Sequence, residues 1–433
     1  MFTEFKDILV FKAGNDLDLF FKKLESYTKR GYWLAGYFSY EFGYFLEQAH
    51  YSLRGKNKAP LAWVGVCKEP IEIRGKDKAF YKKDILSSSP NAYKIKNLRA
   101  NISQKEYAGK IKKIKYYLEQ GLTYQVNFTF KEKFDFTGDV LDLYLSLRRI
   151  QPTAYLALID TAEEQILSLS PELFFRIDRG KIIARPMKGT AKRGVTGEED
   201  FWLRADLRKS KKTRAENLMI VDLLRNDLGR ISKLVRAPKL FSVEKHRTLY
   251  QMTSTVEGEL KENLKLKEIF LSLFPCGSVT GAPKIKTMEL ISKLEKEPRG
   301  IYTGAIGYIS PKGKSCFNVA IRTIRLKNNK GELGIGGGIV YDSRAKAEYE
   351  EALLKARFFR DSLAKAGLIE SILWDKKKGY FLLDLHLRRL KKSARYFSIP
   401  YQEKRIKQRL EKIVFNENES LKIRLVLAPE GKI

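Results

Sequence analysis

The sequence predicts an α+β fold built mostly from antiparallel sheets. Strand-like runs outnumber what a simple alternation of strands and helices would give, and no internal repeat is evident. Two such runs, Leu173 to Ile177 and Ile182 to Ala184, are joined by Asp178-Arg179-Gly180, which predicts a β-hairpin. The 433 residues, 43% hydrophobic and 12% aromatic, can form the cores of two or three domains, or of one large unit and a smaller piece.

The sequence indicates neither a membrane protein nor one held by disulfides or zinc. The N-terminus, MFTEFKDILVFK, lacks the features of a signal peptide, and no apolar run is long enough to span a bilayer, so we expect a cytoplasmic protein. Cys67, Cys276 and Cys316 are far apart and show no Cys-x-x-Cys spacing, which indicates core thiols.

The formal net charge of +32 is compatible with nucleic-acid binding, because clustered Lys and Arg bind phosphate backbones. Here the basic residues are spread along the chain in short runs, and no helix-turn-helix, RNP or zinc-finger pattern is present. A positive field also steers small anions toward a cleft, which suits a polycarboxylate substrate. Nucleic-acid binding is therefore kept only as a remote alternative.

The first quarter of the chain mixes short strands and helices, and surface loops are expected at Gly55 to Lys58 and Lys82 to Ser89. A helix is predicted next, from Ser103 to Gln120, because Ser103 and Glu106 can form a capping box and Gly121 follows its end. A strand, Thr123 to Phe130, comes after it.

The predicted hairpin places Glu172 and Lys188 close to opposite one another at its open end. A lysine near hydrophobic surface can lose its charge and become a nucleophile, since desolvation disfavours the ammonium form. The pair therefore suggests amine chemistry beside a carboxylate. The alternative, an exposed lysine at a strand end, is the more common arrangement in a chain so rich in lysine.

Two long helices are predicted downstream, Phe201 to Leu228 and Ala345 to Leu363. Glu216 lies on the first, whereas Glu348 and Glu351 are three residues apart on the second and share a face. This arrangement is expected if one glutamate binds a hard cation and the other supports it. The alternative is that all three are ordinary surface glutamates.

The Gly/Ser/Thr-rich stretch Phe274 to Lys284 leads into a predicted helix, Ile285 to Leu294. Such a loop, with proline near the first helical position, leaves backbone N–H groups pointing at an anion, helped by the helix dipole. The alternative is an ordinary helix entry capped by Thr280.

Residues 299–308 and 318–325 are predicted to form neighbouring strands. Arg322 interrupts the apolar run of the second, where an unpaired charge would be costly, so it should meet a carboxylate. That carboxylate belongs either to a ligand or to a protein side chain in a structural ion pair, and the sequence leaves both open.

A domain boundary is predicted at Gly367, after which strands are expected at Leu368 to Trp374 and Tyr380 to Leu385. The predicted domains are residues 1–366, made of an N-terminal part (1–98) and a core (99–366), and a small incomplete α+β segment, 367–433.

Several motifs follow one another over most of residues 100–360: SPELFF, PMKGT, AENLMIVDLLRNDLGR, GSVTGAPK, RGIYTGAIGY, VAIRT, and GGGIVYDS with EYEEALLKA. In this order they resemble the chorismate-utilising enzymes, a family that includes anthranilate, aminodeoxychorismate, isochorismate and salicylate synthases. The resemblance implies a large α/β sandwich of two mainly antiparallel sheets with helices outside. It also implies a Mg²⁺ ion that bridges the ring carboxylate of chorismate to Glu216 and Glu351, with Glu348 in support.

Two positions choose the branch that the resemblance implies. Family members that make anthranilate have alanine where Lys188 stands, whereas aminodeoxychorismate synthases have lysine. Isochorismate and salicylate synthases have a lysine base at the position of Gln125, so glutamine argues for ammonia rather than water as the nucleophile. We therefore expect amination of chorismate to 4-amino-4-deoxychorismate, a transaminase-type C–N bond formation toward 4-aminobenzoate and folate. Anthranilate formation is the alternative.

The resemblance also implies roles for single residues. Lys188 attacks ring carbon 2 as the hydroxyl at carbon 4 leaves, with Glu172 as general acid, and ammonia then adds at carbon 4 as the lysine is displaced. The expected substrate contacts are Arg322 and Tyr302 on the enolpyruvyl carboxylate, and Thr190, Thr280, Gly281 and Gly338 elsewhere. No glutaminase triad is visible, so a separate glutamine amidotransferase subunit should supply the ammonia.

Two positions depart from the family pattern. Gln251 stands where many relatives have histidine; because loss of pyruvate needs a proton delivered there, glutamine fits a product that keeps the enolpyruvyl group. Thr213 replaces a commonly acidic residue before Glu216, which bears on the shell of the magnesium ion.

The C-terminal segment has a resemblance of its own. The runs LIES, LDLHLRRLKKSA and IRL resemble the start of fold-type IV pyridoxal-phosphate enzymes, aminodeoxychorismate lyase in particular. Arg389 matches the arginine that touches the cofactor phosphate in that family, but the Schiff-base lysine would lie beyond Ile433. We therefore expect an incomplete lyase-like segment without pyridoxal phosphate. The alternative is an independent module that uses the helix around Arg389 only for packing.

Overall fold

The computed structural model describes residues 1–54, 59–72, 93–194, 196–245, 249–363, 367–397, 399–414, 419–428 and 431–433. The loops expected at Gly55 to Lys58 and Lys82 to Ser89 lie outside these residues. The chain divides into two compact units, Met1–Arg357 and Phe358–Ile433. The boundary expected at Gly367 lies nine residues after Phe358, the first residue of the second unit, and stays a prediction.

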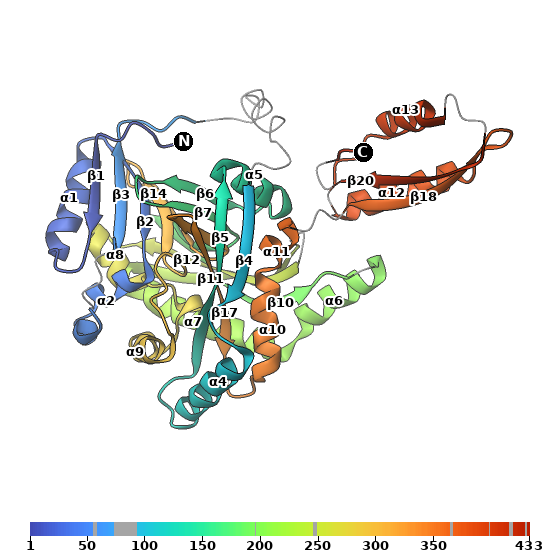
Figure 1. Cartoon of the computed structure of the whole chain (residues 1–433). Helices are drawn as coiled ribbons and strands as arrows, with labels where there is room; N and C mark the ends of the chain where they lie inside the picture. Colours follow the sequence, from blue (N-terminus) through green and yellow to red (C-terminus); the bar gives the residue numbers. More distant parts are fainter. Residues whose placement is uncertain are drawn as a thin grey trace. The chain divides into compact units, whose positions relative to one another are not determined.

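The first unit contains two antiparallel sheets (Figure 1). The strands of the larger sheet are β1 (Asp7–Phe11), β2 (Trp33–Phe38), β3 (Ala62–Cys67), β8 (Leu173–Asp178), β9 (Lys181–Arg185), β10 (Met187–Lys192), β11 (Ser232–Lys245), β12 (Leu249–Leu260), β14 (Ala305–Ile309) and β15 (Ser315–Val319). Their order is β1-β3-β2-β14-β15-β8-β9-β12-β10, with β11 also paired to β12. The predicted hairpin is confirmed as β8 and β9, whose turn has positive φ at Arg179 and Gly180.

The strands of the smaller sheet are β4 (Tyr93–Ala100), β5 (Gln125–Gly138), β6 (Tyr155–Asp160), β7 (Gln165–Ser170), β13 (Gly281–Ala282), β16 (Thr323–Lys327) and β17 (Lys330–Ile339). Their order is β13-β5-β17-β16-β7-β6, with β4 paired to β5. The strand predicted from Thr123 to Phe130 therefore exists, but as β5 it runs on to Gly138. The predicted fold of two mainly antiparallel sheets with helices outside is confirmed.

Helices cover these sheets. They are α1 (Leu17–Lys29), α2 (Gly43–Leu46), α4 (Gln104–Glu119), α5 (Val140–Ile150), α6 (Gly197–Lys209), α7 (Lys211–Ile231), α8 (Leu266–Leu273), α9 (Lys284–Leu294) and α10 (Ala345–Lys355), with 3₁₀ turns at Tyr40–Phe42, Gln48–Leu53 and Gly277–Val279. Helix α7 packs on β10, β11 and β12, α9 on β5, and α10 on β17 and α4. The predicted capping box of Ser103 and Glu106 is present at the start of α4.

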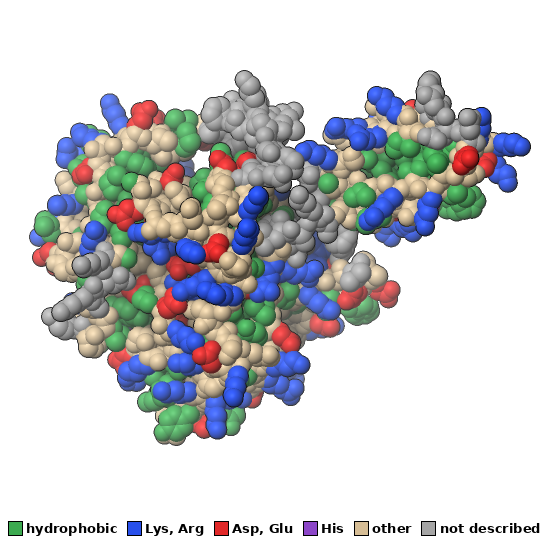
Figure 2. Space-filling view, in the orientation of Figure 1, with side chains coloured by type: hydrophobic (Ala, Val, Ile, Leu, Met, Phe, Trp, Pro, Cys, Tyr) green, Lys and Arg blue, Asp and Glu red, His purple; other side chains and the backbone are tan. Residues whose placement is uncertain are grey.

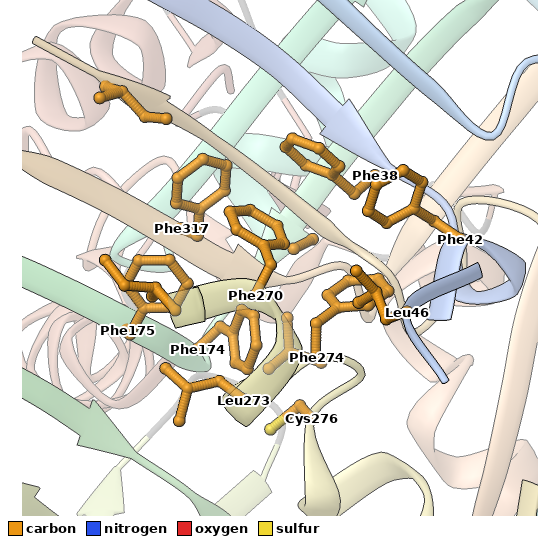
Figure 3. Close-up of a cluster of buried hydrophobic side chains, with 14 of the residues drawn as sticks. Phe38, Phe42, Leu46, Phe174, Phe175, Phe270, Leu273, Phe274, Cys276 and Phe317 are labelled. Carbon is orange, nitrogen blue, oxygen red and sulfur yellow. The ribbon is translucent and has the colours of Figure 1, made fainter. Parts of the chain in front are cut away.

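The core of the larger sheet is rich in phenylalanine. Rings from β2, β8, α8 and β15 lie together (Figure 3), and Phe38 and Phe270 are 4.4 Å apart between ring centroids. Burying each such side chain stabilises the fold by roughly 1.5–3 kcal/mol. The same core includes the apolar face of α7, with Ile220 and Leu224, and so fixes the helix that carries Glu216.

Both long helices predicted from the sequence are broken in the structure. The run from Phe201 to Leu228 is divided between α6 and α7 at Ser210, whose hydroxyl accepts a hydrogen bond from Thr213 N and caps α7. The run from Ala345 to Leu363 is divided at Ala356 between α10 and a second helix, α11 (Arg357–Leu363). Apolar spacing continued across both breaks, which is why one helix was predicted in each case.

The predicted strands 299–308 and 318–325 are also shorter than expected. In the first, only β14 is extended, because the chain before it turns through Gly300 and Thr303, which have φ of 67° and 63°. The second is two strands in different sheets, β15 and β16, with Arg322 between them at φ 50°. The prediction that these segments are neighbours holds for β14 and β15, which pair antiparallel.

The second unit has a three-stranded sheet, β19-β18-β20, made of β18 (Leu368–Asp375), β19 (Gly379–Tyr380) and β20 (Leu421–Leu427), with helices α12 (Leu383–Phe397) and α13 (Glu403–Val414). The strand predicted from Tyr380 to Leu385 is wrong beyond Tyr380. Leu387, Leu390 and Ala394 have helical spacing and are buried in the core of this unit, which favours helix there. Within the described residues no helix is long and apolar enough to cross a membrane.

Candidate active site

Lys188 lies on β10 with 8% of its surface exposed, which excludes an exposed strand-end lysine. Its Nζ lies 3.1 Å from where a Cβ on Gly338 would stand, and Gln125 Nε2 lies 2.6 Å from the same point. Gln125 is the first residue of β5 and Gly338 is the last but one of β17, and these strands pair with Gly338 opposite Asn127. The larger sheet therefore supplies the amine of Lys188, and the smaller sheet supplies the amide of Gln125. The missing side chain of Gly338, also in the smaller sheet, leaves space for both groups.

The surroundings of Lys188 favour an uncharged amine. Burial lowers the pKa of Lys188, and the nearby cation Lys355 lowers it further, while Glu216, Glu172 and Glu351 act in the opposite direction. Lys355 is held in place at the end of α10, where its Nζ donates to the Gly336 carbonyl at 2.9 Å. A neutral amine is the nucleophilic form.

Glu172, just before β8, is 2% exposed. Its Oε1 accepts hydrogen bonds from Ser278 Oγ at 2.6 Å and from the Met187 N–H at 3.3 Å. Burial raises the pKa of Glu172 to about 7, although the bond from Ser278 and the charge of Lys188 lower it. The carboxyl group is thus poised to give or take a proton near neutral pH.

The three glutamates predicted to hold a cation come from α7 and α10. Lys212 Nζ lies 3.9 Å from both Glu216 Oε1 and Glu348 Oε1, so these two carboxylates flank one ammonium. Glu348 is buried and accepts from Ser343 Oγ at 2.7 Å. Glu351, whose side chain is 41% exposed, pairs with Lys355 at 3.0 Å.

These carboxylates fit magnesium by chemistry more than by spacing. Burial raises the pKa values of Glu216 and Glu348, and Glu351 raises both further, while Lys355 lowers the pKa of Glu351. Clustered carboxylates repel one another, and a hard divalent cation that binds their oxygens relieves this repulsion. As they stand, no three His, Cys, Asp or Glu side chains of the described residues converge closely enough to chelate a metal.

Arg322 is 6% exposed, at the crossing between the two sheets. Its Nη2 donates to Gln251 Oε1 at 3.1 Å, and its Nη1 is buried without a partner among the described residues. Burial alone lowers the pKa of Arg322 to about 10. The structural ion pair that the sequence left open is not found in the described part of the chain, which favours a carboxylate from a ligand. Thr190 lies beside this pair, opposite Gln251 in the β10–β12 ladder.

The loop before α9 differs from a simple helix entry. A 3₁₀ turn at Gly277–Val279 is followed by β13, and Pro283 is the residue that precedes α9. Gly281 has φ 141°, and a Cβ there would lie 2.0 Å from the Gln125 carbonyl oxygen, so glycine is required. Thr280 Oγ1 donates to the Cys276 carbonyl at 2.9 Å, so the alternative in which Thr280 caps the helix is wrong.

The remaining predicted residues lie at the edges of this arrangement. The Tyr302 ring packs where a Cβ on Gly334 would stand, and burial raises its pKa. The methyl carbon of Thr213 lies 2.0 Å from where a Cβ on Gly189 would stand. Because Gly189 follows Lys188 in the chain, the start of α7 lies directly beside Lys188.

Three functional candidates were missed from the sequence: Ser278, Lys212 and Lys355. Lys355 carried a signal, because it lies four residues after Glu351 on the same helical face. Lys212 had the same signal with respect to Glu216. Ser278 is far from Glu172 in sequence, and only the folded chain brings the two together.

In the second unit, Arg389 on α12 forms an ion pair with Glu370 on β18 through two hydrogen bonds, and His386 Nδ1 lies 2.7 Å from the same carboxylate. Glu370 is 3% exposed. The guanidinium is thus held by a buried carboxylate, and its assignment as a phosphate position stays a prediction.

Two family models match the sequence. Residues 13–361 match the chorismate binding enzymes, and residues 367–432 match amino-transferase class IV. Together the matches cover both units of the structure.

Curated relatives align with part of the chain. It is 43% identical over 262 residues to a protein of Oryza sativa subsp. japonica named probable aminodeoxychorismate synthase, chloroplastic, which covers 59% of this chain and 29% of that protein. It is 39% identical over 265 residues to anthranilate synthase component 1 of Aquifex aeolicus, which covers 61% of this chain and 54% of that one. The chain therefore spans about half or less of the length of these relatives.

A solved structure has the same fold. The anthranilate synthase component I of Streptococcus pneumoniae TIGR4 superposes with a TM-score of 0.69 at 28% sequence identity, covering 82% of this chain and 90% of that one.

Proposed function

The chain belongs to the chorismate binding enzymes, and from this we propose that it aminates chorismate to 4-amino-4-deoxychorismate and retains the enolpyruvyl group. The observation that carries the proposal is the environment of Lys188. Its amine is buried, its pKa is lowered, and it lies near Gln125 at Gly338 of β17. Relatives named for both aminodeoxychorismate and anthranilate formation align with the chain. Lys188 and Gln251 favour the first.

The proposed reaction uses Lys188 and Glu172 as a pair. The neutral amine attacks ring carbon 2 while the hydroxyl at carbon 4 leaves with the proton of Glu172, which forms a C–N bond and releases water. The attacking nitrogen of Lys188 is then a secondary ammonium. Ammonia adds at carbon 4 as Lys188 leaves carbon 2 as the neutral amine, and the proton that the added nitrogen loses returns to the Glu172 carboxylate. Burial supports both roles, because it lowers the pKa of the lysine and raises that of the glutamate.

Other groups would bind and orient the substrate. Arg322, whose buried Nη1 has no partner among the residues that the structure describes, is suited to the enolpyruvyl carboxylate. We propose that Glu216, Glu348 and Glu351 hold Mg²⁺ beside the ring carboxylate. When bound, Mg²⁺ supplies positive charge that neutralises this carboxylate.

A separate glutamine amidotransferase is proposed as the source of ammonia. A glutaminase of the cysteine type needs an activated thiolate, whereas burial raises the pKa values of Cys67, Cys276 and Cys316. These are all the cysteines of the chain. In vitro, ammonium should replace this partner.

The test is mass analysis of the products formed from chorismate, Mg²⁺ and ammonium, with the matched variant Lys188→Ala. We expect 4-amino-4-deoxychorismate, reduced at least about 100-fold in the variant, because the covalent route is lost. Anthranilate as the product would move the chain to the alternative activity. No turnover of chorismate by the folded protein would refute the proposal.

Nucleic-acid binding has little support in the structure. Figure 2 shows Lys and Arg side chains spread over the visible face, with Asp and Glu among them. Salt-dependent affinity for DNA, together with no binding or turnover of chorismate, would favour nucleic-acid binding over the proposed function.

A further inference from the structure

We propose that Ser278 is a positioning residue that, together with the Met187 N–H, fixes the proton of Glu172 on Oε2. The inference rests on the proposed function in one respect only, which is that Glu172 gives this proton to the leaving hydroxyl. The geometry itself concerns the carboxyl group, the hydroxyl and the thiol of Cys276, and it can be tested without a substrate.

The two oxygens of Glu172 have different surroundings. Oε1 accepts from Ser278 Oγ at 2.6 Å and from the Met187 N–H at 3.3 Å, whereas Oε2 has no hydrogen bond within the described residues. A carbonyl oxygen accepts hydrogen bonds better than the oxygen of a protonated hydroxyl. Two donors on Oε1 therefore favour the acid form that carries its proton on Oε2.

Cys276 fixes the direction of the hydroxyl. Its Sγ lies 3.2 Å from Ser278 Oγ, and burial raises the pKa of this thiol to about 12, so it stays protonated and can donate. A serine hydroxyl has one proton. If the thiol donates to Ser278 Oγ, the Ser278 proton is free to point at Glu172, and the chain runs from Cys276 through Ser278 to Glu172.

The position of Ser278 is set by the backbone. It lies in the 3₁₀ turn Gly277–Val279 and is 3% exposed. Arg299, itself 2% exposed, donates to the carbonyl of Val279 at 2.8 Å and to that of Asn127 at 2.6 Å. This guanidinium ties the loop of Ser278 to β5, so the donor is presented by a rigid support.

Charged and titratable groups from several elements face Glu172: Lys188 on β10, Lys355 on α10, Cys276 on the loop and Tyr302 before β14. Substituting Ser278 changes none of these charges. A change in the titration of Glu172 in Ser278→Ala therefore reports the lost hydrogen bond.

The experiment is an infrared titration of the Glu172 carboxyl group, isolated as the difference between each protein and its Glu172→Gln counterpart. In Ser278→Ala the midpoint should rise by about one pH unit above that of the wild type, because a donor that stabilises the carboxylate is removed. Ser278→Cys, a weaker donor, should give an intermediate midpoint. Cys276→Ala should give a smaller rise. An unchanged or lowered midpoint in folded Ser278→Ala overturns the inference; if that variant does not fold, unchanged midpoints in the other two do so.

Kinetics separates this inference from the proposed function. With chorismate and ammonium, the alkaline limb of the kcat profile should move upward with the infrared midpoint. At pH 6, where Glu172 is protonated in every variant, kcat should still fall roughly tenfold in Ser278→Ala with little change in KM. A shifted infrared midpoint without any chorismate turnover refutes the proposed function alone. A uniform loss of kcat with no shift of the limb means that Ser278 is merely structural.

Discussion

Glu172 and Lys188 show how one environment acts on two groups of opposite charge. Burial raises the pKa of the carboxyl group and lowers that of the amine, so both are driven toward their neutral forms. A surface pair would instead exist as ions. The same burial therefore acts in the direction that the proposed acid and the proposed nucleophile both require.

Gly338 makes this pairing possible, and Gly338→Ala tests it. The added methyl would lie 2.6 Å from Gln125 Nε2 and 3.1 Å from Lys188 Nζ, and both are ends of flexible side chains that can move. We expect the free energy of unfolding to change by less than about 1 kcal/mol, while ammonium-dependent turnover falls at least about tenfold because the amine is displaced. Urea denaturation and steady-state kinetics measure the two effects.

Gly336→Ala is the contrasting control. There the methyl would lie 2.3 Å from the Phe128 carbonyl oxygen, which belongs to the paired strand and cannot yield. This variant should lose roughly 2 kcal/mol or more of stability. Full activity of Gly338→Ala would show that Lys188 does not react in the position described.

At the residue scale, the sequence predicted candidate reactive side chains but not the partners that the fold gives them. Arg322 was predicted because an unpaired charge is costly in an apolar run, whereas Lys188 and Glu172 were predicted from their places at the open end of the hairpin and from the resemblance to the family. The donor to Glu172 was not predicted, because Ser278 is 106 residues away and serine in a Gly-rich loop has many ordinary uses. The partner of Arg322 was expected to be a carboxylate, and in the described protein it is the amide of Gln251.

At the scale of elements, the break between α6 and α7 sets the position of Glu216. Ser210 caps α7, and Thr213, one turn along, touches the backbone beside Lys188. A single continuous helix would carry Glu216 along a different axis. The break is therefore part of how the glutamate reaches the site.

Ser210→Ala tests the role of this cap. Loss of the hydrogen bond to Thr213 N should lower the free energy of unfolding by about 1 kcal/mol. It should also raise the Mg²⁺ concentration needed for half-maximal turnover several-fold, because α7 starts less precisely. Denaturation curves and magnesium titrations give both values.

Thr196→Ala is the matched control, since Thr196 caps α6 in the same way by accepting from Glu199 N. A similar loss of stability with an unchanged magnesium requirement is expected there. Equal magnesium effects in both variants would contradict a specific link between the α7 cap and the glutamates.

The sequence predicted the types of most elements but not where several of them end. Helical spacing of apolar residues continues through Ser210, and an apolar run continues through Arg322. In both places the apolar pattern is the same before and after the break, so the pattern does not reveal the break. The break itself depends on which sheet or helix the following residues pack against, and that is a tertiary effect.

At the scale of the whole molecule, every residue assigned to the proposed reaction lies in Met1–Arg357. The second unit has a core of its own, with Ile372, Leu390 and Ile406 buried in it. The sequence predicted two parts, because their motifs resemble different families, and the two family matches cover residues 13–361 and 367–432.

A chain that ends at residue 366 should therefore keep chorismate turnover with ammonium. We expect kcat within about twofold of the full chain, since no assigned group is removed. Product formation by the shortened and full chains, compared at equal folded concentration, measures this. A large loss of turnover in a shortened protein that still folds would mean that the second unit contributes to the reaction.

The glycines of β17 have a consequence for the unfolded chain. Gly334, Gly336 and Gly338 leave one face of this strand without side chains. The groups that come close there are the Tyr302 ring at Gly334, the Phe128 carbonyl at Gly336, and the Gln125 amide with the Lys188 amine at Gly338. An unfolded glycine samples more conformations than any other residue, so ordering each one costs about 0.5–1 kcal/mol more than ordering alanine. The bare strand thus favours disorder by roughly 2 kcal/mol. A side chain at Gly338 would reduce this cost, but it would enter the space in which the Gln125 amide and the Lys188 amine now lie.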